Sequence, residues 1–204
     1  MMSEKTETMD QLRMMFKYFN RFMIFMWRLG LGNWINSWPE GFGRIMVLVQ
    51  TGRKTGIKRS TPVNYAIVDG KLYCTVGFGD QTHWYKNIME NPEVEVWLPN
   101  GLFQPISWNK GQAKDVTGFD GYLKPLRQVL INSGFVAEMA EYDPKNDSDE
   151  KLAEMTKDYR LVCIENLQPK TGQGGPYDLI WFWPIGFVLL LLILIIVILF
   201  RNRS

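Results

Sequence analysis

An uncharged apolar run at residues 179–200 is the feature that most constrains this chain. The run, LIWFWPIGFVLLLLILIIVILF, has 22 residues, and about 20 apolar residues suffice for a helix to cross the hydrocarbon core of a bilayer. Trp181 and Trp183 stand at one end, where indole rings favour the membrane interface, and Arg201 follows the other end. The run therefore predicts a C-terminal transmembrane helix rather than the buried helix of a soluble domain.

The chain around this run divides into parts of different composition. A Gly- and Pro-rich stretch, QPKTGQGGPYD, lies directly before the run and is typical of a linker. We expect four parts: an N-terminal amphipathic helix region at residues 1–40, a β-barrel domain at 41–168, a linker at 169–178 and the transmembrane helix at 179–200.

The two ends of the chain bear on which side of a membrane the main domain occupies. The first residues, MMSEKTETMDQ, are polar and partly acidic and lack the pattern of a secretory signal, which favours a cytoplasmic domain. Arg201 and Arg203 instead favour a cytoplasmic tail. One span cannot satisfy both, and two terminal arginines are the weaker signal. We therefore expect a single-pass C-terminal anchor with the barrel on the cytoplasmic side.

The N-terminal region contains a predicted helix at residues 9–29 whose cations share one stripe. Arg13, Lys17, Arg21 and Arg28 follow one another at spacings of four, four and seven residues, which places them on one side of a helix. Aromatic residues and methionines occupy much of the remainder. Such a helix suits the surface of an anionic membrane, and it equally suits packing on the barrel with its cations in water.

Charge and cysteine content exclude several classes of function. The formal net charge is +2, so the chain as a whole has no field that would attract nucleic acid. Cys74 and Cys163 lie far apart, each within an apolar run, which suits buried side chains better than a disulfide framework or a zinc site. The one histidine, His83, does not complete a metal site with its neighbours, so we expect no metal.

Short apolar and alternating segments predict a β-rich domain between these ends. Asp69–Gly70 joins two of them and is a strong hairpin signal. We expect strands at residues 44–50, 61–68, 71–78, 93–98, 102–108 and 160–166, and helices at 82–91, 120–132 and 148–158. Strands at this spacing predict a small barrel in a mainly-β fold with helical insertions.

The stretch QTGRKTGIKRSTP, residues 50–62, places four cations on a short turn after a predicted buried strand. Its two glycines allow positive φ, so that backbone N–H groups can converge on one concavity. The turn is therefore either a site for a phosphate or a polycarboxylate or a solvated hairpin tip. It is not a Walker loop, because the Gly-Lys-Ser/Thr ending is absent.

A second stretch, GFGDQTHWYKNIMENP at residues 77–92, joins a Gly-rich turn to the start of a helix. Helix N-termini offer free N–H groups to anions or ring carbonyls. Trp84 and Tyr85 could wall a flat heterocycle, and core packing is the alternative for either aromatic residue taken alone.

Together, TGRKTGIKRSTPVNY, DGKLY and WYKNIMENPEVEV resemble the deazaflavin (F420)-dependent nitroreductase family. The resemblance covers residues 42–169 and is best at 51–96. It implies a split β-barrel of the FMN-binding, flavin-reductase type and the deazaflavin coenzyme F420 as cofactor. It also leaves a homodimer open.

The resemblance also implies roles for individual residues. Lys54 and Arg59 correspond to the cations that grip the phosphate and acidic tail of the deazaflavin, with Arg53, Thr55 and Gly56 alongside them. The matched residues of the following strands would line its ring, and those of the Trp-Tyr-x-Asn helix start would pack over it. No catalytic side chain is assigned. The complete set of implied cofactor-binding residues is Arg53, Lys54, Thr55, Gly56, Arg59, Pro62, Val63, Val76, Gly77, Trp84, Tyr85, Asn87 and Ile88.

The sequence departs from the family where nitro compounds are bound. Gly77 stands where we expect a serine, and Tyr142 and Tyr159 do not reproduce the family spacing of tyrosines. We therefore expect a membrane-tethered oxidoreductase that transfers hydride from reduced F420 to a lipophilic acceptor, such as a quinone or a nitro compound. The alternatives are an FMN-dependent oxidoreductase of the same fold and a non-catalytic split barrel that binds lipid or haem.

Overall fold

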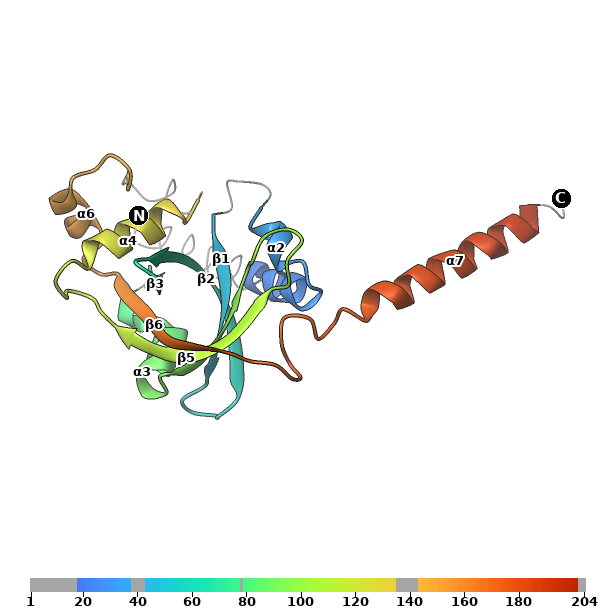
Figure 1. The fold of residues 1–204 in the computed structure, drawn as a ribbon, viewed down its shortest axis with the longest axis horizontal. Helices are drawn as coiled ribbons and strands as arrows, with labels where there is room; N and C mark the ends of the chain where they lie inside the picture. The colour runs from blue at the N-terminus through green and yellow to red at the C-terminus, as the bar shows by residue number, and fades with distance from the viewer. Residues whose placement is uncertain (1–17, 38–42, 78, 135–142, 202–204) are drawn as a thin grey trace, which may run out of the picture.

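The computed structural model describes residues 18–37, 43–77, 79–134 and 143–201 and shows a closed β-barrel flanked by helices, from which one long helix projects (Figure 1). The strand order around the barrel is β1-β2-β3-β6-β5-β4, and neighbouring strands are antiparallel. The strands are β1 (Ile45–Thr51), β2 (Lys58–Val68), β3 (Lys71–Val76), β4 (Glu93–Leu98), β5 (Ser107–Asp115) and β6 (Arg160–Pro169).

Helices lie between the strands and at both ends of the described chain. They are a helix at residues 18–28, α2 (Gly32–Ile35), the short 3-10 helix η2 (Gly79–Gln81), α3 (His83–Glu90), α4 (Leu123–Ile131), α6 (Asp149–Met155) and α7 (Phe182–Arg201). The predicted fold class, a mainly-β split barrel with helical insertions and one apolar C-terminal helix, is confirmed as a six-stranded antiparallel barrel with helices.

The β2–β3 hairpin forms as the Asp-Gly signal predicts. Asp69 and Gly70 have φ values of 51° and 76°, and Val68 pairs with Lys71 across the turn. Positive φ at both central residues is the geometry that matches the twist of the flanking strands. The hairpin fixes the register that places alternate residues of β2 and β3 inside the barrel.

The strand predicted at residues 102–108 is wrong, because β5 begins only at Ser107. Pro105 lacks the N–H that a ladder needs, and the residues before Ile106 form an exposed loop. β5 continues instead to Asp115, with Gly111 and Ala113 buried and their neighbours exposed. A strand whose inward residues are this small gives a weak hydrophobic signal.

Buried side chains form three clusters that explain where the helices lie. The barrel interior holds residues from all parts of the sheet together with Ile88 of α3. α4 and α6 cover the outside of the barrel through Leu126, Leu130 and Leu152. A third cluster joins Trp27 to the outward face of β1. β1 is thus buried on both faces, which accounts for its continuous apolar sequence.

The helix at residues 18–28 packs on the barrel through Met23 and Trp27, which are almost fully buried. Arg28 forms an ion pair with Asp178 at 2.7 Å, so this member of the predicted basic stripe is not a free surface cation. Arg13 and Lys17 lie outside the described residues.

The Gly- and Pro-rich stretch before α7 is docked on the barrel at its C-terminal end. Gly175 and Pro176 are buried, and the hydroxyl of Tyr177 accepts a hydrogen bond from the Ile106 N–H. α7 then extends away from the barrel with its apolar side chains exposed (Figure 1). Within the described chain it is the one helix long and apolar enough to cross a membrane, with a mean hydropathy of 3.1.

Candidate functional site

The basic turn connects β1 to β2, and its backbone is hydrogen-bonded within itself. The Gly52 N–H donates to the Ile57 carbonyl at 2.9 Å, and the Gly56 N–H donates to the Gly52 carbonyl at 2.8 Å. Thr55 also donates to Gly52, at 3.1 Å. The expectation that these N–H groups converge on an anion is therefore wrong for Gly52, Thr55 and Gly56. An anion here would meet side chains.

The turn and the start of α3 enclose an open cavity of about 320 Å³. Its lining consists of Gly52, Arg53, Lys54, Thr55, Arg59, His83 and Asn87. Among these described lining residues are three cations and no carboxylate, so the cavity has the charge that suits a polyanionic ligand.

Arg53 is held in place by Asn87, a buried residue of α3 with 4 % exposure. The Asn87 Oδ1 accepts one hydrogen bond from the Arg53 N–H at 3.2 Å and another from the Arg53 Nη1 at 3.0 Å. One amide oxygen thus fixes both the backbone and the side chain of Arg53. Arg53 is one of the cofactor-binding residues that the resemblance implies, and it lines the cavity.

Arg59 lies across the turn because Gly52 has no side chain. A Cβ added to Gly52 would come within 3.2 Å of the Arg59 Nε and 3.0 Å of the Thr55 Oγ1. Such contacts are tighter than normal packing, so glycine at this position lets the guanidinium approach the backbone. Gly56 supplies the positive φ of 67° that closes the turn.

His83 and Gly52 line the cavity, although neither belongs to the cofactor-binding residues that the resemblance implies. His83 is the first residue of α3 and precedes Asn87 by four positions, which places the two on one helix face. This spacing is the signal that could have identified His83. The side chain of Thr82 makes no capping hydrogen bond to α3, so the Thr82 hydroxyl does not occupy the N–H groups of the first turn.

The remaining predicted site residues do not line the cavity, and most of them lie in or beside the barrel core. Val63, Val76, Tyr85 and Ile88 belong to the buried interior cluster, and Trp84 packs against it partly exposed. Pro62 pairs with Val47 across β1 and β2, Gly56 is exposed on the turn, and Gly77 is exposed at the end of β3. The structure therefore brings five predicted residues to the cavity, namely Arg53, Lys54, Thr55, Arg59 and Asn87.

Tyr85 points its hydroxyl at the Asp115 carboxylate inside this core. Burial and the hydrogen bond to Asp115 raise the pKa of Tyr85 to about 12. Asp115 also accepts a hydrogen bond from the Thr117 N–H at 2.7 Å. Burial would raise the pKa of Asp115, but the bonds from Thr117 and Tyr85 outweigh it and lower that pKa. This pair ties α3 to β5.

Gly77 lies next to Tyr159. A Cβ at Gly77 would lie 3.6 Å from the Tyr159 Cζ and 3.8 Å from its Oη, which is ordinary van der Waals contact. The position expected to carry a serine in the resembling family therefore has room for a small side chain beside a tyrosine.

Lys58, the fourth cation of the basic turn, belongs to a different network. Its Nζ donates to the Glu95 carboxylate, which also accepts from Lys170 at 2.6 Å and from the Trp108 Nε1 at 2.9 Å. Lys58 is therefore not a free surface cation. Glu95 of β4, Trp108 of β5 and Lys170, which directly follows β6, form a structural link that the sequence pattern does not predict.

A sequence profile of the F420H(2)-dependent quinone reductase family matches residues 27–145, which include β1 to β5 and the whole cavity lining. This chain belongs to that family. Members of this family are oxidoreductases with coenzyme F420 as cofactor. Of the two cofactors that the sequence left open, F420 and FMN, the family match supports F420. No match was found among curated proteins.

Solved structures include more distant similarities to this chain. A conserved hypothetical protein from Mycobacterium tuberculosis is 16 % identical, with 71 % of this chain and 90 % of that chain covered and a TM-score of 0.44. A NimC/NimA family protein from Clostridium acetobutylicum is 14 % identical, with coverage of 62 % and 76 % and a TM-score of 0.39. A heme-binding protein from Mycobacterium smegmatis is 13 % identical, with coverage of 74 % and 60 % and a TM-score of 0.43.

The residues that line the cavity fit the chemistry of F420. The deazaflavin carries a phosphate and glutamate carboxylates, which require cations and tolerate no nearby acid. Arg53, Lys54 and Arg59 meet the first requirement, and the absence of Asp and Glu from the described lining meets the second. The N-terminus of α3, whose first residue His83 lines the cavity, adds a partial positive charge.

Proposed function

We propose that this protein catalyses hydride transfer from reduced F420 to a lipophilic acceptor that is dissolved in a membrane. A quinone is the acceptor that we propose first. The observation that carries the proposal is the cavity at the basic turn, whose described lining contains three cations and no carboxylate. Membership of the F420H(2)-dependent quinone reductase family supports the same conclusion. The exposed apolar helix α7 supports the choice of a membrane-dissolved acceptor.

Lys54 and Arg59 would bind the phosphate and the carboxylates of the cofactor tail through charge-assisted hydrogen bonds. Arg53 would add a third cation whose direction is set by Asn87. Gly52 leaves room for Arg59, and Gly56 closes the turn that presents these side chains. What these residues contribute is position, because hydride transfer needs a ring held at a fixed place and a clear face for the acceptor.

Predicted residues that do not line the cavity would support the ring end of the cofactor. The candidates are Pro62, Val63, Val76, Gly77, Trp84, Tyr85 and Ile88, whereas Gly56 belongs to the turn that holds the tail. Several of these are core residues in the structure, so their proposed role is to shape the wall rather than to donate hydrogen bonds. Bound F420 in its reduced form supplies a hydride, and quinone reduction is completed by one proton from solvent.

Tethering through α7 would bring the barrel to the membrane that dissolves its acceptor. The helix spans Phe182–Arg201, and its exposed apolar surface has the length needed for one crossing. The tether restricts the search for a lipid-soluble quinone to two dimensions and raises the encounter rate.

The proposal is tested with the full-length protein in liposomes that contain a menaquinone analogue. Reduced F420 is added outside, and its oxidation is followed with and without the protein. We expect protein-dependent oxidation that requires the quinone. Failure to oxidise reduced F420 in quinone-containing liposomes, by protein that still binds F420, would overturn the assigned acceptor.

A further inference from the structure

The start of α7 is fixed to the barrel by several contacts with the helix at residues 18–28. Arg28 forms a two-point ion pair with Asp178, and its carbonyl accepts a hydrogen bond from the Leu179 N–H at 3.1 Å. The Trp183 Nε1 donates to the Leu29 carbonyl at 3.0 Å. The apolar helix therefore leaves the barrel at a defined place.

The loop between β4 and β5 is held at the same place. Asn33 of α2 is buried, and it accepts a hydrogen bond from the Asn100 N–H at 3.0 Å and donates another to the Gln104 carbonyl. Ile106, at the end of the loop, donates to Tyr177 in the segment before α7. With both ends fixed, the tip of the loop presents Phe103, which is 91 % exposed.

The outward side of the neighbouring helix is also aromatic. Phe22 and Phe25 are three positions apart and exposed, whereas Met23 and Trp27 face the barrel. A packed helix normally presents polar residues to water on its outer side.

Trp34 of α2 and Leu102 of the loop add further exposed apolar surface. We call Phe22, Phe25, Trp34, Leu102 and Phe103 the interfacial face.

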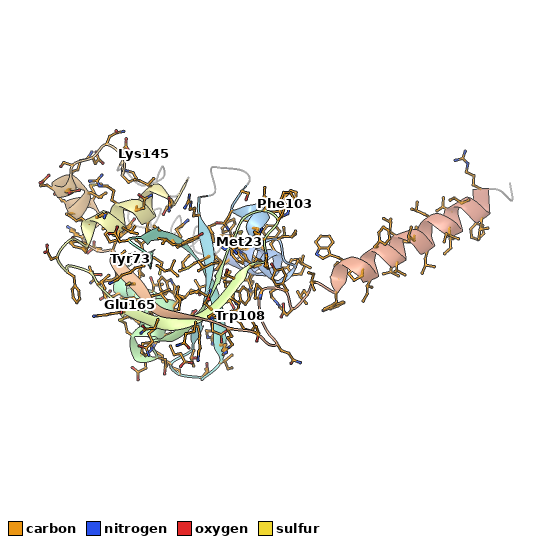
Figure 2. The ribbon with its side chains drawn as sticks, in the orientation of Figure 1. Met23, Tyr73, Phe103, Trp108, Lys145 and Glu165 are labelled. Atoms are coloured by element: carbon orange, nitrogen blue, oxygen red, sulfur yellow. The ribbon has the colours of Figure 1, made fainter. Side chains whose placement is uncertain are left out.

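We propose that the interfacial face enters the headgroup region of the same bilayer that α7 crosses. The inference rests on the proposed membrane span. Figure 2 shows Phe103 on the side of the barrel from which α7 departs, and the hydrogen bonds to Asn33 and Tyr177 make this surface continuous with the start of the apolar helix. Lipid is thus the occupant that already lies beside the face once α7 is inserted.

The chemistry of the face fits the interface more closely than the hydrocarbon core. Aromatic rings are enriched at the headgroup level, and a surface of this kind enters a bilayer by roughly 5–10 Å. Arg21, exposed on the same helix, would meet anionic headgroups at its edge. The barrel would then rest on the membrane at a fixed orientation instead of moving freely on a tether.

Fluorescent labelling of single cysteines tests this contact in the full-length protein. Burial raises the pKa of Cys74 to about 12 and also raises the pKa of Cys163, so both native thiols are protected from a thiol-reactive dye. Phe103→Cys and Phe22→Cys place an environment-sensitive dye on the interfacial face. Phe119→Cys is the matched control, since Phe119 is exposed in the β5–α4 connection, which lies away from α7 (Figure 1).

The labelled proteins are reconstituted into vesicles of phosphatidylcholine and phosphatidylglycerol that contain lipid with a quencher near the headgroup. We expect a blue shift and at least about twofold stronger quenching at positions 103 and 22 than at 119, as for side chains at interfacial depth. Equal quenching at all three positions, or a blue shift at 103 without quenching by lipid, would overturn the inference; the latter result would indicate contact with a second copy.

Extraction with alkaline carbonate separates this inference from the proposed span. Protein that resists extraction but shows no quenching at positions 103 and 22 has an inserted α7 and a free interfacial face, which contradicts only the inference. Release of the protein by carbonate would contradict the span itself, and the proposed contact with it.

Discussion

Arg28 and Asp178, 150 positions apart in the sequence, meet in a two-point ion pair: the Arg28 Nε lies 2.8 Å from the Asp178 Oδ1, and its Nη2 lies 2.7 Å from Oδ2. This geometry gives both attraction and direction. It joins the helix at residues 18–28 to the segment that leads into α7. The relation between barrel and apolar helix is thus partly determined by one pair of side chains.

We predict that Arg28→Ala loosens the start of α7 without unfolding the barrel. Because both side chains remain partly exposed, at 40 % and 25 %, the pair contributes about 1 kcal/mol or less to the free energy of unfolding. Amide exchange at Leu179, whose N–H is bonded to the Arg28 carbonyl, should accelerate. Arg21→Ala, which removes an exposed cation from the same helix, serves as the control, and equal exchange in the two variants would contradict the assigned role.

The Glu95 carboxylate should make stability sensitive to acid. Burial would raise its pKa, but hydrogen bonds from Lys170, Lys58 and Trp108 outweigh burial and lower the pKa below its ordinary value of 4.5. Since the folded-state pKa is below the unfolded-state pKa, this contribution to the free energy of unfolding is complete above about pH 4.5 and is lost as pH falls through the lower folded-state value.

Urea unfolding of the wild type and of Glu95→Gln across this pH range measures the effect. The wild type should lose stability more steeply with falling pH than the variant, which lacks the titrating group. Parallel stability curves for the two proteins would show that Glu95 does not pair with Lys58, Lys170 and Trp108 in solution.

Gly77→Ser should change acceptor preference without harming the fold. An added Cβ at this position meets Tyr159 at ordinary contact distance, and the residue is exposed. If the serine of the resembling nitroreductases positions a nitro group through one hydrogen bond, the ratio of kcat/KM for a nitro compound to that for a quinone should rise about tenfold. Gly77→Ala controls for the added carbon, and equal ratios in both variants would exclude a hydrogen bond from this position.

Much of the fold could be predicted because local chemistry and tertiary structure agree. Asp69–Gly70 takes positive φ where the sequence requires it, and Ser148 caps α6 with a hydrogen bond from the Lys151 N–H at 3.3 Å. β5 could not be located, because its buried positions Gly111 and Ala113 carry almost no apolar surface. Its stability comes from pairing with β4 and β6, which local sequence does not contain.

The candidate site also has features that the sequence could predict and features that it could not. The clustered cations and glycines predicted the basic turn as a site. The shared helix face of His83 and Asn87 could have predicted the rest of the cavity lining. The roles of individual cations could not be read from the sequence. Lys58 is engaged by Glu95, which also binds Lys170, 75 positions away in the sequence, and only the closed barrel brings these residues together.

The affinity for F420 tests the central claim most directly. Fluorescence titration of full-length protein should show that Lys54→Ala and Arg59→Ala each raise the Kd about 10- to 100-fold, because a hydrogen bond to a charged group contributes about 1.5–3 kcal/mol. Lys145→Ala, an exposed cation on the other side of the barrel from the β1–β2 turn (Figure 2), should leave the Kd unchanged. An unchanged Kd in both Lys54→Ala and Arg59→Ala would contradict the assignment of the cavity as the cofactor site.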